Sequence, residues 1–432
     1  METLDLIRKK LMGNGVDDVV LKKIDIDESM IKFVNNKIVK TGIETGQLID
    51  IFVAKDKKLV STSLKEFDEE TINKTVKKIL EFLRTAQKNT SYVGIPENKF
   101  KYPKVENIYD KKILDIDPIE IVNTSINSAL KNAKRTAGTF QSSTGKTLIL
   151  TSTGIQQEYD SSSLYLSLRS FFTKEASGHK TVTSSMLKNF NYEEASEKAG
   201  EIAKLSANPK GGTPGNYDVI FSPLAFAPIL DNVGDALSIF NVESGMSFFN
   251  DKLGENLGNF NLIDNGALQN GVASSPFDAE GYPRQRTEVI TDGVLKTFLH
   301  NHSSAERHKT KSTGNAGIIS QNPSNLILNG KQGNPFEIKH GIYVSNVWYT
   351  RFQNYSTGDF STIPRDGMFL IKNGEISEPI KNLRVSENVL NMLKNISVFG
   401  NEIEQITSWE AETPCHLAPL LIKNVRMTKP TA

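Results

Sequence analysis

The sequence predicts an α+β fold whose first half contains two helix, meander, helix modules and whose second half is mainly antiparallel β with a few helices. Three observations support this class. Amphipathic helical patterns alternate with β-branched, alternating segments before residue 208. After it, Asp292-Gly293 and Asn373-Gly374 each lie between apolar runs, which is a strong signal for hairpins with type I′ turns. Three glycines and two prolines within residues 208–215 separate the two patterns.

The first module begins with a predicted helix over residues 2–12, in which Leu4, Ile7 and Leu11 have helical spacing. Residues 18–64 then follow a strand pattern, and breaks are expected near Asp27, Asn35-Asn36, Gly46 and Lys55-Asp56. Asp68 is expected to cap a second helix. The apolar stripe of that helix consists of Ile72, Val76, Ile79, Leu80 and Leu83.

The second module repeats this order after a polar connection over residues 88–107. Asp117 as cap, Pro118 at the first helical position and Glu120 at the third predict a helix. Its apolar residues are Ile119, Val122, Ile126 and Leu130. Strands are predicted at 148–150 and at 163–171. In the second, three leucines alternate with Tyr165, Ser167 and Arg169, as in a strand with one buried face; the leucines are Leu164, Leu166 and Leu168. A capped helix over residues 191–207 completes the module.

These patterns predict an N-terminal α+β domain over residues 1–207, with modules at about 1–90 and 108–207. A C-terminal, mainly β domain is predicted over residues 216–432. It begins with an expected strand at 218–221 and a helix from about 225 to 240.

Composition excludes several classes of protein. The 432 residues carry 51 Lys and Arg against 50 Asp and Glu, so the chain lacks the basic excess typical of nucleic-acid binding. One cysteine cannot form an internal disulfide, and no apolar run reaches the roughly 18 residues of a membrane span. The charges within the opening METLDLIRKKLM are unlike a secretory signal. We therefore expect a cytoplasmic protein with neither nucleic-acid nor membrane partners.

Four groups of residues are candidate sites. Gly145-Lys146-Thr147 lacks the earlier glycine of a phosphate loop, because position 140 is Phe. His300, His302 and His308, with Glu306, form a loose metal-ligand pattern or a polar turn. Cys415 and His416 are adjacent, so on a strand they would face opposite ways and could not act as nucleophile and base. Asp231 and Asp235 share one face of the predicted helix. This face could bind a cation, but we favour a solvated surface.

Two turns rich in glycine and small hydroxyl residues are candidate contact sites, since glycine lets the backbone approach a partner closely. Ordinary tight turns are the alternative. The candidate residues for substrate or partner contact are Ser312, Thr313, Gly314, Asn315 and Gly317 in the first turn, and Ser356, Thr357, Gly358 and Asp359 in the second.

Through these turns the sequence resembles the TldD/PmbA family, also called TldD/TldE and once described as modulators of DNA gyrase. The resemblance is carried, in this order, by residues 270–281, 292–295, 311–317, 356–360, 373–376 and 398–404. It continues more loosely in the first half through residues 60–63 and 92–96. The order of the segments is more specific than any one of them.

Within that family, TldD-type chains are similar to metallopeptidases with an HExxxH helix and a cysteine near the C-terminus, whereas PmbA/TldE-type chains lack the motif and pair with TldD. Alignment on Val233-Gly234 puts Leu230, Asp231 and Asp235 at the His, Glu and His positions. The resemblance thus implies a PmbA/TldE-like chain without metal, and zinc in a TldD-like partner. The role of Cys415 stays open, because the ungapped alignment does not place it on the ligand position.

The function predicted on these grounds is that of the non-zinc subunit of a TldD/TldE-type metalloprotease complex acting on peptides or unfolded polypeptides. The partner would be an HExxxH subunit, giving a heterodimer, or a second copy, giving a homodimer. The main alternative is a homo-oligomeric peptide-binding protein without catalytic activity. A different enzyme that uses Asp231, Asp235 or the His300 cluster is a further one.

Overall fold

The computed structural model describes residues 1–97 and 99–429. In the first half the elements are α1 (Glu2–Met12), β1 (Asp18–Val34), β2 (Lys37–Lys55), β3 (Lys58–Leu64), α2 (Glu69–Thr85), η1 (Lys111–Asp115), α3 (Pro118–Leu130), β4 (Arg135–Thr151), β5 (Gln156–Phe171), β6 (Ser177–Ser184), η2 (Leu187–Asn189) and α4 (Tyr192–Leu205). The order of helix, three strands and helix therefore occurs twice, and the α+β class is confirmed.

The second half continues with β7 (Lys210–Gly211), β8 (Gly215–Phe221), α5 (Pro223–Ala236), α6 (Ile239–Glu243), β9 (Phe260–Asn265), β10 (Arg286–Thr291), β11 (Val294–Leu295), α7 (His302–Arg307), β12 (Leu326–Gly330), β13 (His340–Val344), β14 (Val347–Asn354), β15 (Asp359–Pro364), β16 (Met368–Lys372), β17 (Glu375–Lys381), β18 (Arg384–Asn388), α8 (Val389–Lys394), β19 (Ile396–Phe399), β20 (Glu404–Ser408), β21 (Ala411–Leu417) and β22 (Leu420–Thr428). Strands dominate this half, as predicted.

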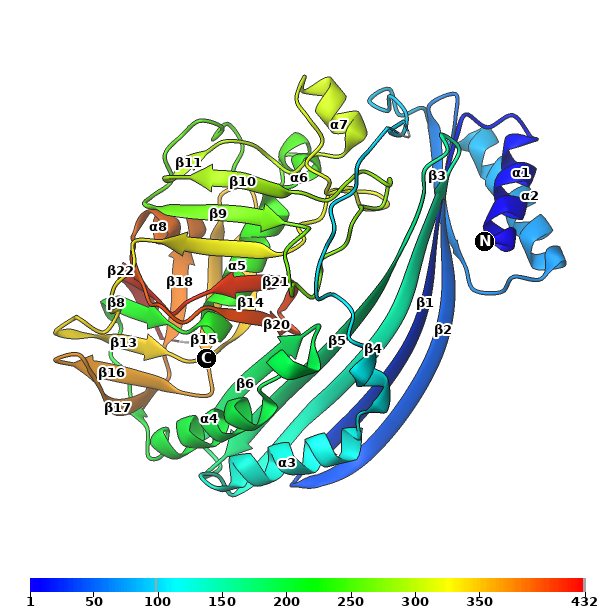
Figure 1. Ribbon diagram of the computed structural model, residues 1–432. Coiled ribbons are helices and arrows are strands. Elements are labelled where there is room, and N and C mark those ends of the chain that lie inside the picture. The colour runs from blue at the N-terminus through cyan, green and yellow to red at the C-terminus, as the bar shows by residue number, and fades with distance from the viewer. Residues whose placement is uncertain (98, 430–432) are drawn as a thin grey trace.

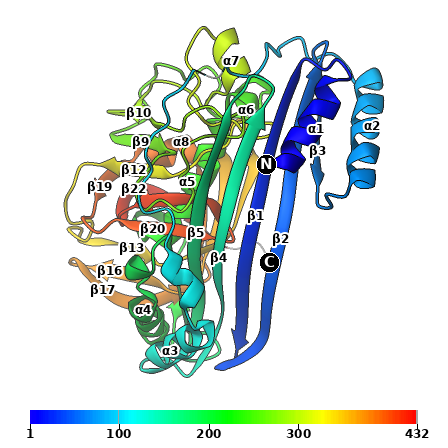
Figure 2. The same cartoon turned by 45° about the vertical axis from the view of Figure 1, so that its right-hand side comes forward.

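The strands of both modules join in one antiparallel sheet of order β3-β2-β1-β4-β5-β6. In Figure 1 it forms a long curved wall, with α1 and α2 at one end and α3 and α4 at the other. Val19, Leu21, Ile31 and Phe33 of β1 share one face and pack into the cores under these helices. Val20, on the opposite face, packs with Phe277 of the second half. Figure 2 shows the sheet between α1 and α2 on one side and the second half on the other.

The largest core lies in the second half, between two further sheets. One has the order β11-β10-β9-β12-β21-β20, and the other runs from β14 at one edge through β15, β18, β22, β8, β13, β16 and β17 to β7. Helix α5 is buried in this core along most of its length. Both predicted hairpins are present, with positive φ at Asp292, Gly293, Asn373 and Gly374.

Several predicted boundaries are wrong. Asp27 and Gly46 do not interrupt strands: Asp27 pairs with Thr45 and Gly46 with Ile26 inside the β1–β2 ladder. The helix expected over 225–240 is split into α5 and α6. Asn191 precedes α4, but its side chain makes no capping hydrogen bond. In α3, Ile119 is exposed and Ile121 takes its place in the core.

The connection over residues 88–107 contains neither a helix nor a strand in its described part, and it runs along the second half. At the expected domain boundary, β7 ends at Gly211 and β8 begins at Gly215, so no element crosses Gly211-Gly212. The domain division itself stays a prediction. Across the described residues, no helix is long and apolar enough to span a membrane.

Candidate functional site

A pocket of about 660 Å³ lies beside α5 and includes both aspartates of that helix in its wall. The rest of the wall comes from four distant segments: the loop between β9 and β10, the loop before β12, strand β14 with the turn after it, and strand β21 with the turn before it. The lining residues are Asp231, Asn232, Asp235, Ala273, Asn322, Pro323, Ser324, Thr350, Arg351, Tyr355, Trp409, Glu410, Glu412, Thr413 and Pro414. We call this site the acidic pocket.

Asp231 is half-buried against β21, so the expectation of a solvated helix face is wrong for this residue. The backbone N–H of Thr413 donates a hydrogen bond to Asp231 Oδ1 at 3.1 Å. Burial raises the pKa of Asp231, and the hydrogen bonds from Thr413 oppose that rise. Asp231 thus ties helix α5 to the strand that carries the cysteine.

Asp235 reaches solvent inside the same pocket, one helical turn further on. Removal of water by the pocket walls raises the pKa of Asp235 to about 7, and the negative charges of Asp231 and Glu412 add to this rise. Near neutral pH, the protonated and the ionised forms of this carboxyl group are therefore present in comparable amounts. It can donate a hydrogen bond to a carbonyl oxygen or accept one from an N–H group.

Negative charge dominates the acidic pocket. Its wall carries four carboxyl groups, those of Asp231, Asp235, Glu410 and Glu412, against the single guanidinium group of Arg351. Glu410 is the most constrained of them, because it accepts hydrogen bonds from the backbone N–H groups of Tyr349 at 2.7 Å and Thr350 at 3.3 Å. Its nearest oxygen lies 3.6 Å from Arg351 Nη1.

An aromatic cluster adjoins this pocket. The rings of Trp348 and Trp409 have centroids 4.3 Å apart, and the Tyr349 ring meets Trp409 edge-on. Trp409 and Tyr349 are about half exposed, at 49% and 53%. Tyr349 has a φ of 61°, a strained value for a bulky residue, and the hydrogen bond to Glu410 stabilises it. Sequence reasoning missed this cluster and Glu410 entirely.

The residues at the aligned HExxxH positions do not fit zinc. Leu230 has no ligating atom and is fully buried in the core. Cys415 is also fully buried, and its thiol donates hydrogen bonds to the carbonyls of Thr413 at 3.3 Å and Ala227 at 3.6 Å. Burial raises the pKa of Cys415 well above its ordinary value, and Asp231 adds to the rise, so the thiol is neutral. Within the described chain, no group of three or more His, Cys, Asp or Glu side chains could hold a metal ion.

The first predicted contact turn is mostly internal. Ser312, Thr313, Gly314 and Asn315 are buried; Thr313 Oγ1 accepts from His300 N–H, and Asn315 Nδ2 donates to Asp264 Oδ2. Only Gly317 is partly exposed, and it lines a second pocket between the two halves. Whether this turn contacts a ligand stays a prediction.

The second predicted turn connects β14 with β15 and is open to solvent at Ser356, Thr357 and Asp359. Asn388 stabilises it by donating hydrogen bonds to Thr357 O at 2.7 Å and Asp359 Oδ1 at 3.0 Å. Gly358 has a φ of 81°, and a Cβ there would contact Phe248. Tyr355, directly before the turn, lines the acidic pocket.

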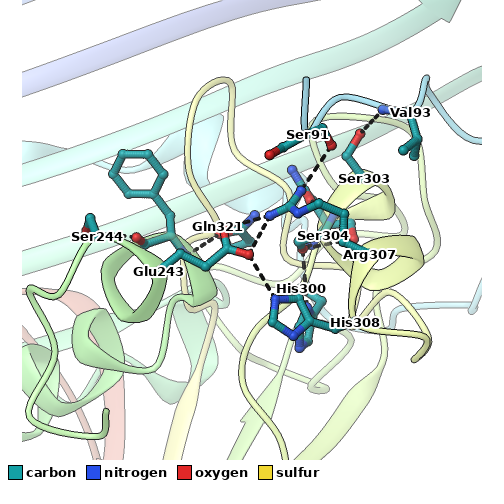
Figure 3. A network of polar contacts seen from close by, with 12 residues as sticks. Ser91, Val93, Glu243, Ser244, His300, Ser303, Ser304, Arg307, His308 and Gln321 are labelled. Atoms are coloured by element: carbon teal, nitrogen blue, oxygen red, sulfur yellow. Dashed lines mark hydrogen bonds and ion pairs between the residues drawn. The ribbon is translucent and has the colours of Figure 1, made fainter. Parts of the chain in front are cut away.

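The histidine cluster is held together by protein groups. His300 is buried beside His308, with ring centroids 5.3 Å apart. His308 and Arg307 both bind the Glu243 carboxylate, as Figure 3 shows. The ring of His416 is on the opposite side of β21 from the Cys415 thiol, as the strand pattern predicts.

Comparisons with known proteins give one consistent result. A family model described as the PmbA/TldA metallopeptidase C-terminal domain matches residues 214–429. An uncharacterized protein of Methanocaldococcus jannaschii is 29% identical over 379 residues, covering 85% of this chain and 86% of that protein. The metalloprotease PmbA of Escherichia coli O157:H7 is 26% identical over 366 residues, covering 80% and 78%. The structure of TldE from Thermococcus kodakarensis has a TM-score of 0.88 at 20% identity, covering 99% of this chain and 100% of that one.

The residues matched by the family model include α5, the lining of the acidic pocket and Cys415. The match places this chain among proteins related to metallopeptidases. The chain belongs to the TldD/PmbA family.

Proposed function

We propose that this chain is the PmbA/TldE-like, zinc-free subunit of a TldD/TldE-type peptidase that acts on peptides or unfolded polypeptides. A TldD-like partner would hold the catalytic zinc. The observation that carries the proposal is the set of residues at the aligned motif, a buried leucine and two aspartates, which offer at most two ligating side chains. A catalytic zinc site usually needs three protein ligands, and this set does not supply them.

The surroundings of the pocket support contact with a peptide main chain. Among the described strands, β14 lies at the edge of its sheet, and Thr350 and Arg351 of this strand line the acidic pocket. The backbone N–H groups of Tyr349 and Thr350 already donate to Glu410. A peptide could add to the edge of β14 after Thr350 through main-chain hydrogen bonds, which tolerate varied side chains. Asp235, with a pKa of about 7, can pair with either a carbonyl or an N–H group of such a peptide.

The test is to assay the purified chain, a TldD-like partner and their mixture on one unfolded substrate such as casein, with and without chelator. We expect cleavage only in the mixture and loss of cleavage when the partner's zinc is removed. Chelator-resistant cleavage by this chain alone would refute the proposal and direct attention to Asp231 and Asp235. Peptide binding by a homo-oligomer that gains no activity from any partner would favour the alternative of a non-catalytic binding protein.

A matched pair of variants tests the role of the pocket. Arg351→Glu and Asp235→Lys each change a pocket charge without altering the buried core, and both should reduce activity of the mixture. Glu255→Lys, at an exposed position outside the pocket, should not. Equal activity of all three mixtures would show that the charges of the acidic pocket are not needed for the activity of the complex.

A further inference from the structure

A second pocket, of about 370 Å³, lies between the N-terminal sheet and the second half. One wall is formed by β1, β2 and β3, and the opposite wall by α6, α7 and the loops around residues 279–280 and 317–321. The connection after α2 closes one side through Asn89, Ser91 and Tyr92. Its volume lies within the range of small-molecule sites, and we call it the inter-half pocket.

Hydrogen bonds hold α6, α7 and the connection after α2 together at this pocket. Arg307 of α7 binds both carboxylate oxygens of Glu243 at 2.6 Å and donates to Ser91 O at 3.1 Å. Ser303 accepts a hydrogen bond from Val93 N–H at 3.2 Å. Figure 3 shows this network joining α6, α7 and the connection. These groups have partners within the protein, so the pocket is preformed and they are not free to bind a ligand.

One carboxyl group in the pocket, that of Glu280, has no basic partner among the described residues. The wall contains three carboxyl groups, of Asp50, Glu243 and Glu280, and two cations, Lys22 and Arg307. Arg307 pairs with Glu243, and Lys22 lies opposite Asp50 in the β1–β2 ladder. Glu280 is left over: in the described part of the chain, no basic nitrogen lies within 4.0 Å of its carboxylate.

Only one of the two carboxylate oxygens of Glu280 has a hydrogen-bond partner among the described residues. Its Oε2 accepts a hydrogen bond from the backbone N–H of His302 at 3.0 Å, whereas Oε1 has no hydrogen-bond partner among the described residues. Burial, together with the neighbouring Asp278, raises the pKa of Glu280 well above its usual range. A carboxyl group in such surroundings gains from any ligand that brings a hydrogen-bond donor and a positive charge.

Apolar side chains line another part of the pocket and favour contact with an apolar group. Phe52 and Leu59 of the sheet face Phe240, Ile318 and Ile319 of the second half around the same cavity. Ile318 and Ile319 are 42% and 76% exposed, so the pocket opens to solvent beside them. An apolar body would gain by covering these side chains.

We propose that the inter-half pocket binds a primary ammonium group attached to an apolar group, with the ammonium donating a hydrogen bond to Glu280 Oε1 and the apolar group covering Ile318 and Ile319. Two sources share this chemistry: a small free amine, and the amino-terminal residue of a peptide that begins with an apolar side chain. The inference does not depend on the zinc-free assignment, because none of these residues lies in the acidic pocket.

Isothermal titration calorimetry on the full chain tests this inference. The probes are 3-methylbutylamine, the peptide Leu-Gly-Gly amide, and its N-acetylated form, which keeps the side chain and lacks the ammonium group. We expect binding of at least one of the first two and none of the acetylated peptide. Binding of 3-methylbutylamine alone identifies the small amine as the source, and binding of the peptide alone identifies an amino terminus. Absence of binding by both, or equal binding of the acetylated peptide, would overturn the inference.

Two variants test whether the probe contacts Glu280 and Ile319. Glu280→Gln keeps an acceptor for His302 N–H but cannot ionise beside the ammonium group, so we expect roughly 10- to 100-fold weaker binding of the probe that binds. Ile319→Ser, at an exposed position that should not disturb folding, is expected to weaken binding about fivefold. Glu288→Gln, at an exposed ion pair outside the pocket, is the control and should bind as the unmodified chain does. Unchanged affinity in both pocket variants would place binding elsewhere and refute the inference.

Discussion

Two residues, Leu230 and Cys415, bear most directly on whether this chain can hold zinc. Leu230 has no donor atom, and Cys415 is fully buried with its thiol hydrogen-bonded to the carbonyl groups of Ala227 and Thr413. We therefore predict that the isolated chain retains no stoichiometric zinc. Elemental analysis after dialysis against dilute chelator checks this. One tightly held zinc per chain would contradict it and would return attention to His300, His302 and His308.

Asp235 makes stability depend on pH. Its pKa is raised from 3.8 to about 7 by burial and by the charges of Asp231 and Glu412, so the unfolded chain ionises this group more readily than the folded one. Its contribution is fully present below pH 3.8 and is lost as pH rises through about 7. We predict that Asp235→Asn, which cannot ionise, is more stable than the unmodified chain at pH 8 by about 1 kcal/mol, a modest value because solvent screens this exposed group.

Urea unfolding at pH 5 and at pH 8 measures this effect, as the difference between the two proteins at each pH. Asp115→Asn, at an exposed position outside the pocket, is the matched control and should show no such difference. A stability gap that is equal at both pH values would contradict the assigned origin of the raised pKa.

The long strands of the N-terminal sheet differ in how tightly their glycines are packed. A Cβ at Gly138 of β4 would lie 2.2 Å from Ser167 O and 2.5 Å from the Phe33 ring, whereas one at Gly42 of β2 would meet nothing within 4 Å. We predict that Gly138→Ala destabilises the protein by roughly 1–3 kcal/mol through overpacking. Gly42→Ala, the matched control, should be neutral or slightly stabilising. Thermal unfolding of both variants checks the contrast, and equal effects would contradict it.

Sequence patterns predicted the elements whose signals are local. The Asp68 and Asp117 caps and both type I′ hairpins need only neighbouring residues, and the structure confirms all four. The wrong boundaries depend on distant partners. Asp27 continues β1 because Thr45 Oγ1 donates a hydrogen bond to it at 2.8 Å, which makes a turn-forming residue a cross-strand partner.

The break between α5 and α6 has the same kind of cause. Ser238 Oγ donates to Gln321 Oε1 at 3.1 Å, and Ile239 N–H donates to Leu299 O at 3.2 Å. These contacts replace the next helical hydrogen bonds, and no local pattern could reveal them. The acidic pocket was found only in part for this reason: helical spacing placed Asp231 and Asp235 together, whereas Glu410 and Glu412 approach helix α5 from the β20–β21 hairpin.

A buried ion pair joins the two halves of the whole molecule. Arg169 of β5 lies 2.8 Å from Asp366, whose side chain is fully buried in the loop between β15 and β16. Ser177 donates a hydrogen bond to the same carboxylate at 2.6 Å, and Asn346 Nδ2 donates to it at 3.0 Å. Burial opposes ionisation of Asp366, but Arg169, His179 and these donors outweigh it and hold its pKa below the ordinary value of 3.8.

Loss of this charge should weaken the junction between the halves. Asp366→Asn preserves the shape of the side chain but leaves the guanidinium group of Arg169 without its counterion, and we predict destabilisation of about 3 kcal/mol. Glu378→Gln, which removes a partly exposed surface partner of Lys210 and Lys372, is the control and should have little effect. Both tryptophans, Trp348 and Trp409, lie in the second half, so their fluorescence reports on that half while far-UV circular dichroism reports on both. In urea we expect the two signals to coincide for the unmodified chain and to separate for Asp366→Asn, because halves that lose their shared ion pair unfold less cooperatively. An unchanged midpoint with coincident signals would show that other contacts, such as the Lys180–Glu404 pair between β6 and β20, hold the halves together without it.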